Sequence, residues 1–544
     1  MPHAAPVPSV GVQALILCGP GLSLNTFTSK EESEKCLIPV ANRPMVFYPL
    51  DFCRRSGITD VTLITPSSSV PRLQAALQQN PHLTALQNLK PSIVAAGDMT
   101  MGTAEILRLP EVQAAIKTDF LVLPCDLLCE IPGESLLEAW MVYGAAAGTG
   151  TRGGLSVYYQ TQGREESVKG EATDFLAIAP LGQNEAPAVS HPSDGPAALR
   201  LGGLSKVVLS APMDTIKENI EQDKGLLIRH SLVQKHPNTK ILTTFRDSHI
   251  YIFPKWVKDL ARRQEKFQSI SEDLIGYWAK SEWQQGLGEK LGLDEIFEQE
   301  EGNHTGDTLS HDGGESVEEE IDLQAMSTTK SAASINVDSP ISFASRVKVP
   351  DSAAKSSVQV PPILAHVQRS AAPFVRRVDS SAILLSTSLR LAKLESIEEV
   401  GRQAASPFAH NQKIAHPEGV AQRCTVTKSD CLLDRGVTVA EKSVIKESVL
   451  GPNVKISSGA RLQRCLVLEG AVIGERCQLT NCIIGAHSQI GRESVLKDCE
   501  VQDGNVVPEE TDAKNEKFMV FEGFDDDDMD DAGDFDNDED DEGF

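Results

Sequence analysis

Aliphatic residues recur at intervals of five or six between residues 433 and 501, and few folds produce such a period. The repeated positions are Leu433, Val439, Ile445, Leu450, Ile456, Leu462, Leu468, Ile473, Leu479, Ile484, Ile490, Leu496 and Val501, with glycines after several of them at Gly451, Gly474, Gly485 and Gly491. An α-helix or a flat sheet does not have this period. Each triangular coil of a left-handed parallel β-helix takes three hexapeptides and stacks their aliphatic side chains inside. Chance spacing does not explain a pattern of this length, so the sequence predicts a left-handed β-helix over residues 421–507.

The chain before residue 298 alternates between predicted strands and predicted helices. Short apolar stretches bounded by turns predict strands at residues 12–18, 58–65, 120–123, 155–159, 175–178 and 249–253. Helical patterns cover residues 44–57, 70–77, 103–116, 256–266 and 271–280, and Pro110 should break the third of them. Such alternation is typical of a doubly wound, mostly parallel sheet, so we expect an α/β domain over residues 12–297.

Composition predicts the state of the remaining segments. Residues 1–11 form a disordered N-terminus, and residues 298–359 form a disordered linker, because polar residues dominate the linker and cannot bury enough surface to order it. A connecting segment follows at residues 360–420. Residues 508–544 are predicted to be an acidic disordered tail. The tail either keeps the protein soluble or offers Phe524, Phe535 and Phe544 to a basic partner, and the sequence leaves both alternatives open.

The formal net charge of −26 is concentrated at the C-terminus, where residues 522–544 hold fourteen acids and no base. The remainder still carries −12, which is unsuited to tracking nucleic-acid phosphates. Eleven cysteines are scattered without paired metal spacing, so we expect free thiols in a reducing compartment and no metal site. No apolar run is long enough to span a membrane, and the N-terminus lacks a signal pattern. The sequence therefore predicts a soluble cytosolic protein.

The first predicted strand leads into a glycine turn, Gly19-Pro20-Gly21. Strands followed by glycine loops present backbone N–H groups to phosphate in α/β folds, because only glycine lets the backbone approach so closely. Gly19 and Gly21 are therefore candidate nucleotide-binding residues. The alternative is that they serve only as a turn between strand and loop.

Four elements in this order, followed by a hexapeptide β-helix, resemble the sugar-nucleotide pyrophosphorylase family. They are the glycine loop, Lys35, the Gly102-Thr103-Ala104 step and Asp126 at the end of a strand. The resemblance implies that the loop and Lys35 meet phosphate, that Gly102 and Thr103 lie near the base, and that Asp126 holds Mg²⁺. Each residue has a structural alternative: Lys35 as a surface or interface charge, Asp126 as a turn cap, and Thr103 as the first residue of a helix.

The chain departs from that family at the residues that handle charge. Ser23 stands where the family loop has arginine, Cys36 replaces a proline after the lysine, and Cys125 replaces the glycine before the metal aspartate. Nucleotidyl transfer develops negative charge on phosphate, and losing a fixed cation lowers the rate by orders of magnitude. We therefore expect a scaffold with no catalytic residues and no cofactor, in which Gly19, Gly21, Lys35, Gly102, Thr103 and Asp126 are vestigial candidates for binding GTP or ATP. The alternative is an active enzyme such as a mannose-1-phosphate guanylyltransferase.

One branch of the superfamily is a better match, the subunits of translation initiation factor 2B that join a degenerate pyrophosphorylase-like domain to a β-helix. The similar passages are residues 36–50, 269–275 and 376–380. Of the two subunits with this layout, epsilon continues into a helical exchange domain, whereas the acidic stretch after the last hexapeptide of this chain has no helical periodicity, so the chain resembles the subunit without that domain. The resemblance implies a non-catalytic subunit that pairs with epsilon and the other subunits and supports nucleotide exchange on initiation factor 2. A scaffold outside translation is a third possibility.

Overall fold

The computed structural model describes residues 11–28, 34–86, 89–97, 101–146, 152–181, 204–298 and 359–519. The segments predicted to be disordered at residues 1–11 and 298–359 lie almost entirely outside these ranges, as does the tail from residue 520, so their state stays a prediction. Among the helices of the described ranges, none combines the length and apolar character that a membrane crossing requires.

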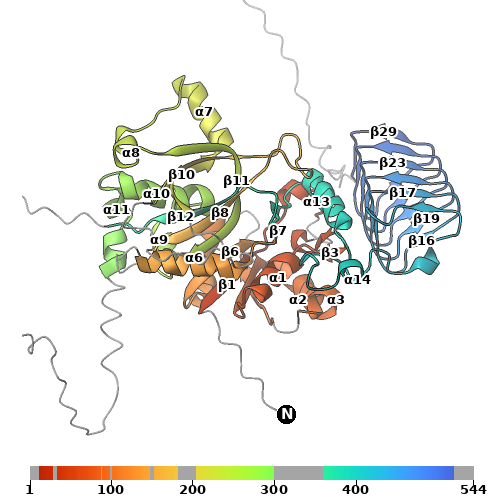
Figure 1. Ribbon diagram of the computed structural model, residues 1–544, viewed down its shortest axis with the longest axis horizontal. Coiled ribbons are helices and arrows are strands. Elements are labelled where there is room, and N and C mark those ends of the chain that lie inside the picture. Colours follow the sequence, from red (N-terminus) through yellow and green to blue (C-terminus); the bar gives the residue numbers. More distant parts are fainter. Residues whose placement is uncertain are drawn as a thin grey trace, which may run out of the picture.

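The N-terminal part of the chain is built on one nine-stranded sheet (Figure 1). Its order is β5-β4-β1-β6-β11-β8-β12-β10-β9. The strands are β1 (Val12–Leu17), β4 (Val61–Pro66), β5 (Ser92–Ala96), β6 (Asp119–Pro124), β8 (Gly154–Gln160), β9 (Asp174–Ala179), β10 (Leu204–Pro212), β11 (Lys240–Phe253) and β12 (Ile363–Gln368). Parallel pairing joins β5, β4, β1 and β6, but β11 is antiparallel to β6 and β8. Strand β12 is also parallel to β8, whereas β10 is antiparallel to β12 and β9, so the predicted mostly parallel sheet is mixed.

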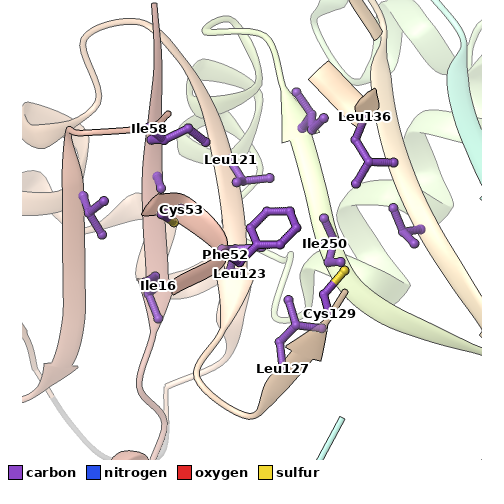
Figure 2. Packing of buried hydrophobic residues seen from close by; sticks show 14 of the residues in the cluster. Ile16, Phe52, Cys53, Ile58, Leu121, Leu123, Leu127, Cys129, Leu136 and Ile250 are labelled. Carbon is purple, nitrogen blue, oxygen red and sulfur yellow. The ribbon is translucent and has the colours of Figure 1, made fainter. Parts of the chain in front are cut away.

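Helices cover both faces of the sheet, as a doubly wound fold requires. The described helices of this part are α1 (Phe47–Arg55), α2 (Val70–Gln79), α3 (Pro81–Thr84), α4 (Thr103–Arg108), α5 (Pro110–Ala115), α6 (Gly133–Ala146), α7 (Met213–Asp223), α8 (His230–Lys235), α9 (Val257–Arg263), α10 (Ile275–Trp283) and α11 (Leu287–Lys290). Alternate residues of a strand point to opposite faces. Ile16 thus joins the core under α1 and α6 (Figure 2), whereas Leu15 joins the core under α4 and α9.

The α/β domain extends beyond the predicted boundary at residue 297. Strand β12, from the predicted connecting segment, inserts between β8 and β10, parallel to β8. Strand β13 (Val375–Arg377) pairs with β7 (Leu127–Cys129), directly after Asp126. The sequence did not indicate these pairings because they join segments separated by the long linker.

A tight hairpin delays the start of the first helix. Strands β2 (Pro39–Val40) and β3 (Arg43–Pro44) are joined by two residues with positive φ, 46° at Ala41 and 65° at Asn42. Two-residue hairpins require this left-handed geometry, which asparagine tolerates well. The helix predicted from residue 44 therefore begins at Phe47.

The C-terminal part is the predicted left-handed β-helix, with three parallel sheets as its sides. The first sheet comprises β14 (Thr425–Val426), β17 (Val444–Lys446), β20 (Arg461–Gln463), β23 (Gln478–Thr480), β26 (Val495–Lys497) and β29 (Asp512–Lys514). The second comprises β15 (Leu432–Leu433), β18 (Val449–Leu450), β21 (Leu466–Val467), β24 (Ile483–Ile484), β27 (Glu500–Val501) and β30 (Lys517–Phe518). The third comprises β16 (Thr438–Val439), β19 (Lys455–Ile456), β22 (Val472–Ile473), β25 (Gln489–Ile490) and β28 (Val506–Val507). Equivalent residues of successive coils are 17 apart from β15 onward, as in the pairing of Thr438 with Lys455, whereas the first pairing, Thr425 with Val444, spans 19 residues.

Twelve of the thirteen predicted aliphatic positions fill the interior of the β-helix, and Leu468 is the exception. Val467 takes the interior place, while Leu468 packs outside the coil against the α/β domain. The predicted end at residue 507 is also too early. Ala513 and Phe518 continue the interior row through β29 and β30. Alanine gives a weak aliphatic signal, which is why the last coil was not recognised.

The second side of the β-helix packs against the α/β domain through helix α13 (Ser381–Lys393), which lies between the two parts in Figure 1. We define the interface cluster as the buried residues shared by both: Leu24, Phe27, Ile38, Val40, Ala41, Met45, Tyr48, Leu128, Phe374, Val378, Ile383, Leu384, Leu385, Leu389, Leu391, Ala392, Phe408, Leu432, Val449, Leu466, Leu468 and Ile483. Polar contacts add to it. Asn42 donates from Nδ2 to the carbonyl of Leu450 at 2.9 Å, and Arg43 donates to the carbonyls of Phe408 and Ala409. One continuous core therefore joins the two parts.

Candidate functional site

A cavity of about 200 Å³ lies at the ends of β1 and β6, where the sequence predicted a nucleotide site. Gly19, Lys35, Thr103 and Asp126 line it. Gly21 and Gly102 stand beside lining residues without lining the cavity themselves. The structure thus brings four of the six predicted residues to one cavity, and their proposed role in nucleotide binding stays a prediction.

Asp126 is held by two cations inside this cavity. Its Oδ2 accepts a bond from Lys35 Nζ at 2.7 Å, and its Oδ1 accepts one from Arg377 Nε at 3.2 Å. Arg377 Nη2 also lies 3.3 Å from Oδ2, and Arg377 Nη1 lies 3.0 Å from His249 Nε2. The backbone segments that carry Asp126 and Arg377 lie side by side. The N–H of Val378, which follows Arg377, donates to the Asp126 carbonyl at 2.8 Å. Both carboxylate oxygens are therefore occupied by the chain's own cations.

The charged side chains around Asp126 shift one another's pKa values and so determine which of them are ionised. Burial acts to raise the pKa of Asp126, but the neighbouring Arg377 and Lys35 outweigh it and hold that pKa well below its usual range. Burial acts to lower the pKa of Lys35, and Asp126 outweighs it, so the lysine stays charged. Burial and the Arg377 cation lower the pKa of His249 well below its usual value, so its imidazole is neutral near pH 7.

The segment 376–380 contributes to one side of the cavity through Arg377. Strand β13 places Arg377 towards Asp126 and the fully buried Arg376 towards Glu171, whose Oε2 accepts from Arg376 Nη2 at 2.5 Å. The following Asp379 forms an ion pair with Arg246. Ser23, at the position where the family loop has arginine, donates its hydroxyl to the backbone carbonyl of Asp379. In the family that this chain resembles, the loop binds phosphate. Here the hydroxyl of Ser23 in that loop binds the protein's own backbone.

The glycine turn has a structural role at one of its two glycines. Gly21 has a φ of 79°, and a Cβ there would lie 2.7 Å from Cβ of Lys35. Gly19 has neither constraint, because a Cβ would meet nothing within 4 Å. Further along the loop, Thr26 donates its hydroxyl to Glu500 of the β-helix at 2.8 Å, and Ser381 donates to the other oxygen of Glu500. The loop is thereby attached to the β-helix.

The Gly102-Thr103-Ala104 step is attached to the chain at residues 268–270. The Ala104 N–H donates to the Gln268 carbonyl at 2.9 Å, and the Ile270 N–H donates to Thr103 Oγ1 at 2.9 Å. A Cβ on Gly102 would lie 2.2 Å from the Gln268 oxygen, so this close approach requires glycine. Thr103 is also the first residue of α4, as its structural alternative predicted.

A divalent metal does not fit this site. Mg²⁺ requires carboxylate oxygens free to coordinate it, whereas both oxygens of Asp126 bind cationic side chains. The described residues also contain no other group of three or more His, Cys, Asp or Glu side chains arranged to hold a metal ion. Asp126 is therefore an ion-pair partner, and no step of metal chemistry can be derived from it.

Sequence reasoning missed Arg377 and His249 as members of the site. Arg377 had been noted only within a passage of resemblance, and the contact with Asp126 spans 251 positions of the chain. The usable signal was the pair of adjacent arginines in an otherwise apolar strand, because a buried arginine needs an acidic partner.

A second buried acid near the site should make stability depend on pH. Burial and the nearby Asp174 raise the pKa of Asp247 to about 7. An unfolded aspartate titrates near 3.9. Between these values the folded protein binds more protons than the unfolded chain, so the free energy of unfolding falls as pH rises from about 4 to 7 and then levels off.

We expect the Asp247→Asn variant to lose this dependence, since the amide cannot ionise. Its free energy of unfolding at pH 8 should exceed that of the unmodified protein by about 1–3 kcal/mol and match it more closely at pH 5. Urea unfolding at both pH values measures the difference. Asp214→Asn, at an exposed position on α7, is the control and should leave the pH dependence unchanged. Equal slopes in the two proteins would contradict the assignment to Asp247.

The architecture and the site together define a class: a nucleotidyltransferase-like α/β domain whose cavity at the ends of β1 and β6 holds an internal ion-pair group, followed by a left-handed β-helix. Comparison with known proteins agrees with this class. The family described as the GMPPB C-terminal domain, from the sugar nucleotidyltransferases, matches residues 427–520, most of the β-helix.

More specific similarity comes from three curated proteins, each named translation initiation factor eIF2B subunit gamma. The Schizosaccharomyces pombe protein is 27% identical over 277 residues, 51% of this chain and 52% of that protein. The Dictyostelium discoideum protein is 22% identical over 263 residues, 44% and 50% of the two chains. The Caenorhabditis elegans protein is 28% identical over 123 residues, 22% and 28% of the two chains. The match to the first of these relatives thus spans about half its length. The predicted resemblance to gamma-type subunits is confirmed.

Proposed function

We propose that this chain is a non-catalytic, gamma-type subunit of the guanine-nucleotide exchange factor for translation initiation factor 2. Similarity to three proteins named as eIF2B subunit gamma supports the proposal. In this role the chain works by binding: it holds the catalytic epsilon subunit, assembles with the other subunits of the factor and contacts initiation factor 2 as the substrate G protein. The compartment for that role is the cytosol.

The observation that carries the non-catalytic part of the proposal is the saturation of Asp126 by Lys35 and Arg377. Nucleotidyl transfer needs fixed positive charge on the phosphates and a metal to neutralise the charge that develops. Here two cations of the cavity neutralise a protein carboxylate. The hydroxyl of Ser23, in the loop, binds the backbone at Asp379. The same contacts argue against an active sugar-1-phosphate nucleotidyltransferase.

Reconstitution with the epsilon subunit tests the proposed role. Tagged full-length chain, co-expressed with epsilon, should recover it in a stable complex, and that complex should release labelled GDP from initiation factor 2 faster than epsilon alone. A matched test uses the Asp214→Asn variant, whose exposed change on α7 should leave both results intact. Failure to recover epsilon, or equal exchange rates with and without the chain, would reject the role.

The absence of a nucleotide cofactor is a separate proposal with its own prediction. Titration of the full chain with MgGTP or MgATP should give no binding heat at millimolar nucleotide, because Asp126 is not free to bind the metal. Incubation with GTP and mannose-1-phosphate should release no pyrophosphate. Measurable binding heat would show that the cavity binds nucleotide. Steady pyrophosphate release would show that the chain is an active nucleotidyltransferase.

A further inference from the structure

Three buried cysteines lie at or beside the cavity. Cys18 follows β1, Cys125 follows β6, and Cys36 lies next to Lys35. All three are buried in the same core, and Cys18 and Cys125 also line the cavity. The neighbouring thiols of Cys125 and Cys36, together with burial, raise the pKa of Cys18 well above its ordinary value. The nucleotide-binding candidates do not account for this cluster.

Strand pairing places Cys18 and Cys125 opposite each other. Strands β1 and β6 are parallel, and Leu17 pairs with Pro124, so the next residues along each strand are Cys18 and Cys125. The Cys125 N–H donates to the Leu17 carbonyl at 3.0 Å, which extends the ladder to this point. Neighbouring strands lie about 4.8 Å apart, and facing residues point to the same side of the sheet. Disulfides span Cα separations of roughly 4.4–6.8 Å, so this pair can be bridged with little backbone movement.

The cavity gives small oxidants a path to these sulfurs. Cys18 is 3% exposed and Cys125 is 1% exposed, so bulk solvent scarcely reaches them directly. Both nevertheless line a cavity of about 200 Å³, which is large enough for several water-sized molecules. By contrast, Cys53 is buried in the same core without lining the cavity, and Cys424 in the β-helix is partly exposed. These two thiols provide internal comparisons for burial and for exposure.

We propose that Cys18 and Cys125 form a redox-sensitive thiol pair that hydrogen peroxide converts to a disulfide inside the cavity. One sulfur attacks the peroxide: the S–O bond forms, the O–O bond breaks, and the leaving hydroxide takes up the thiol proton as water. The second sulfur attacks the resulting sulfenic acid: the S–S bond forms, the S–O bond breaks, and a second water leaves. The peroxide is reduced to water and the two thiols are oxidised together. Disulfides in reducing compartments are usually of this transient, redox-sensing kind.

Oxidation of the folded full-length chain tests the proposal. The protein is titrated with hydrogen peroxide, quenched, alkylated after denaturation and digested for mass spectrometry. A Cys18–Cys125 disulfide should appear at a peroxide dose that leaves Cys424 and Cys53 alkylatable, and dithiothreitol should reverse it. Exposure alone predicts the opposite order, with Cys424 oxidised first. Cys424 reacting before the pair, or a Cys18–Cys36 disulfide in its place, would overturn the proposal.

Two variants distinguish specific oxidation of the Cys18–Cys125 pair from general oxidation of buried thiols. Cys18→Ser should abolish the disulfide, and the sulfenic acid then left on Cys125 should be trapped by dimedone. Cys53→Ser changes a buried thiol of the same core and should leave both the disulfide and its dose unchanged. A disulfide of Cys125 that persists at the same dose in the Cys18→Ser protein would refute the assignment to Cys18. Because the primary test uses the unmodified chain, it stands even where a variant folds poorly.

Discussion

Replacing Asp126 with asparagine is expected to lower the free energy of unfolding by about 3–5 kcal/mol. The carboxylate accepts bonds from Lys35 at 2.7 Å and from Arg377 at 3.2 Å, and its side chain is 1% exposed. Without the negative charge, two cations remain next to each other in the interior with no acid between them. Removing one partner of a buried ion pair is costly because it leaves an uncompensated charge behind.

Urea unfolding at pH 7 measures the effect, with Asp214→Asn on the exposed side of α7 as the matched control, expected within about 0.5 kcal/mol of the unmodified protein. Adding Lys35→Met to Asp126→Asn should recover part of the loss, since one of the two opposed cations is then removed. An Asp126→Asn protein as stable as the parent would show that the ion pairs are not structural.

The direction in which Asp126→Asn changes the free energy of unfolding distinguishes a catalytic site from a structural ion pair. Catalytic groups are often held at a cost in stability, so their removal is frequently neutral or stabilising. Asp126 in a working nucleotidyltransferase would belong to that group. Here the carboxylate is needed to neutralise Lys35 and Arg377. A large destabilisation therefore argues for a scaffold, independently of any activity measurement.

The sequence predicted the parts of the fold whose signal is local and repeated. The hexapeptide pattern identified the β-helix because each hexapeptide places one aliphatic side chain in the interior, three in every coil. It failed where two adjacent residues were equally apolar, at Val467 and Leu468, since periodicity alone could not tell the interior residue from the one that faces the α/β domain. It also failed at Ala513, whose small side chain gives a weak signal.

The sequence predicted only the site residues that belong to recognisable local motifs. The sequence identified Lys35 and Asp126 as candidates, but not that they bind each other, because a family resemblance assigns each residue to a ligand. Arg377 lies 251 positions from Asp126 and beyond the linker, and its contact depends on the pairing of β13 with β7. Tertiary pairing of this kind has no local signature, which is why the ion pairs of Asp126 inside the cavity emerged only from the structure.

Leu466→Asp is expected to uncouple the β-helix from the α/β domain. Leu466 is fully buried in the interface cluster, whereas its neighbour Val467 points into the β-helix, so the substitution affects the contact and spares the interior of the coil. Burying an unpaired carboxylate there should destabilise the docked state by about 3–5 kcal/mol. The single unfolding transition expected of one continuous core should then separate into two.

Scanning calorimetry of the full chain resolves this change, and limited proteolysis between α13 and β14 should accelerate with it. Val506→Asp is the matched control: it makes a valine-to-aspartate change on β28, where the side chain is 60% exposed, and it should leave a single transition. One transition in the Leu466→Asp protein at an unchanged midpoint would mean that the interface cluster contributes little. The polar contacts of Asn42 and Glu500 would then have to hold the two parts together, and their removal would be the change that separates the transitions. A rigid connection matters for the proposed function, because a subunit that acts only by binding must hold its two surfaces in a fixed relation to support a catalytic partner.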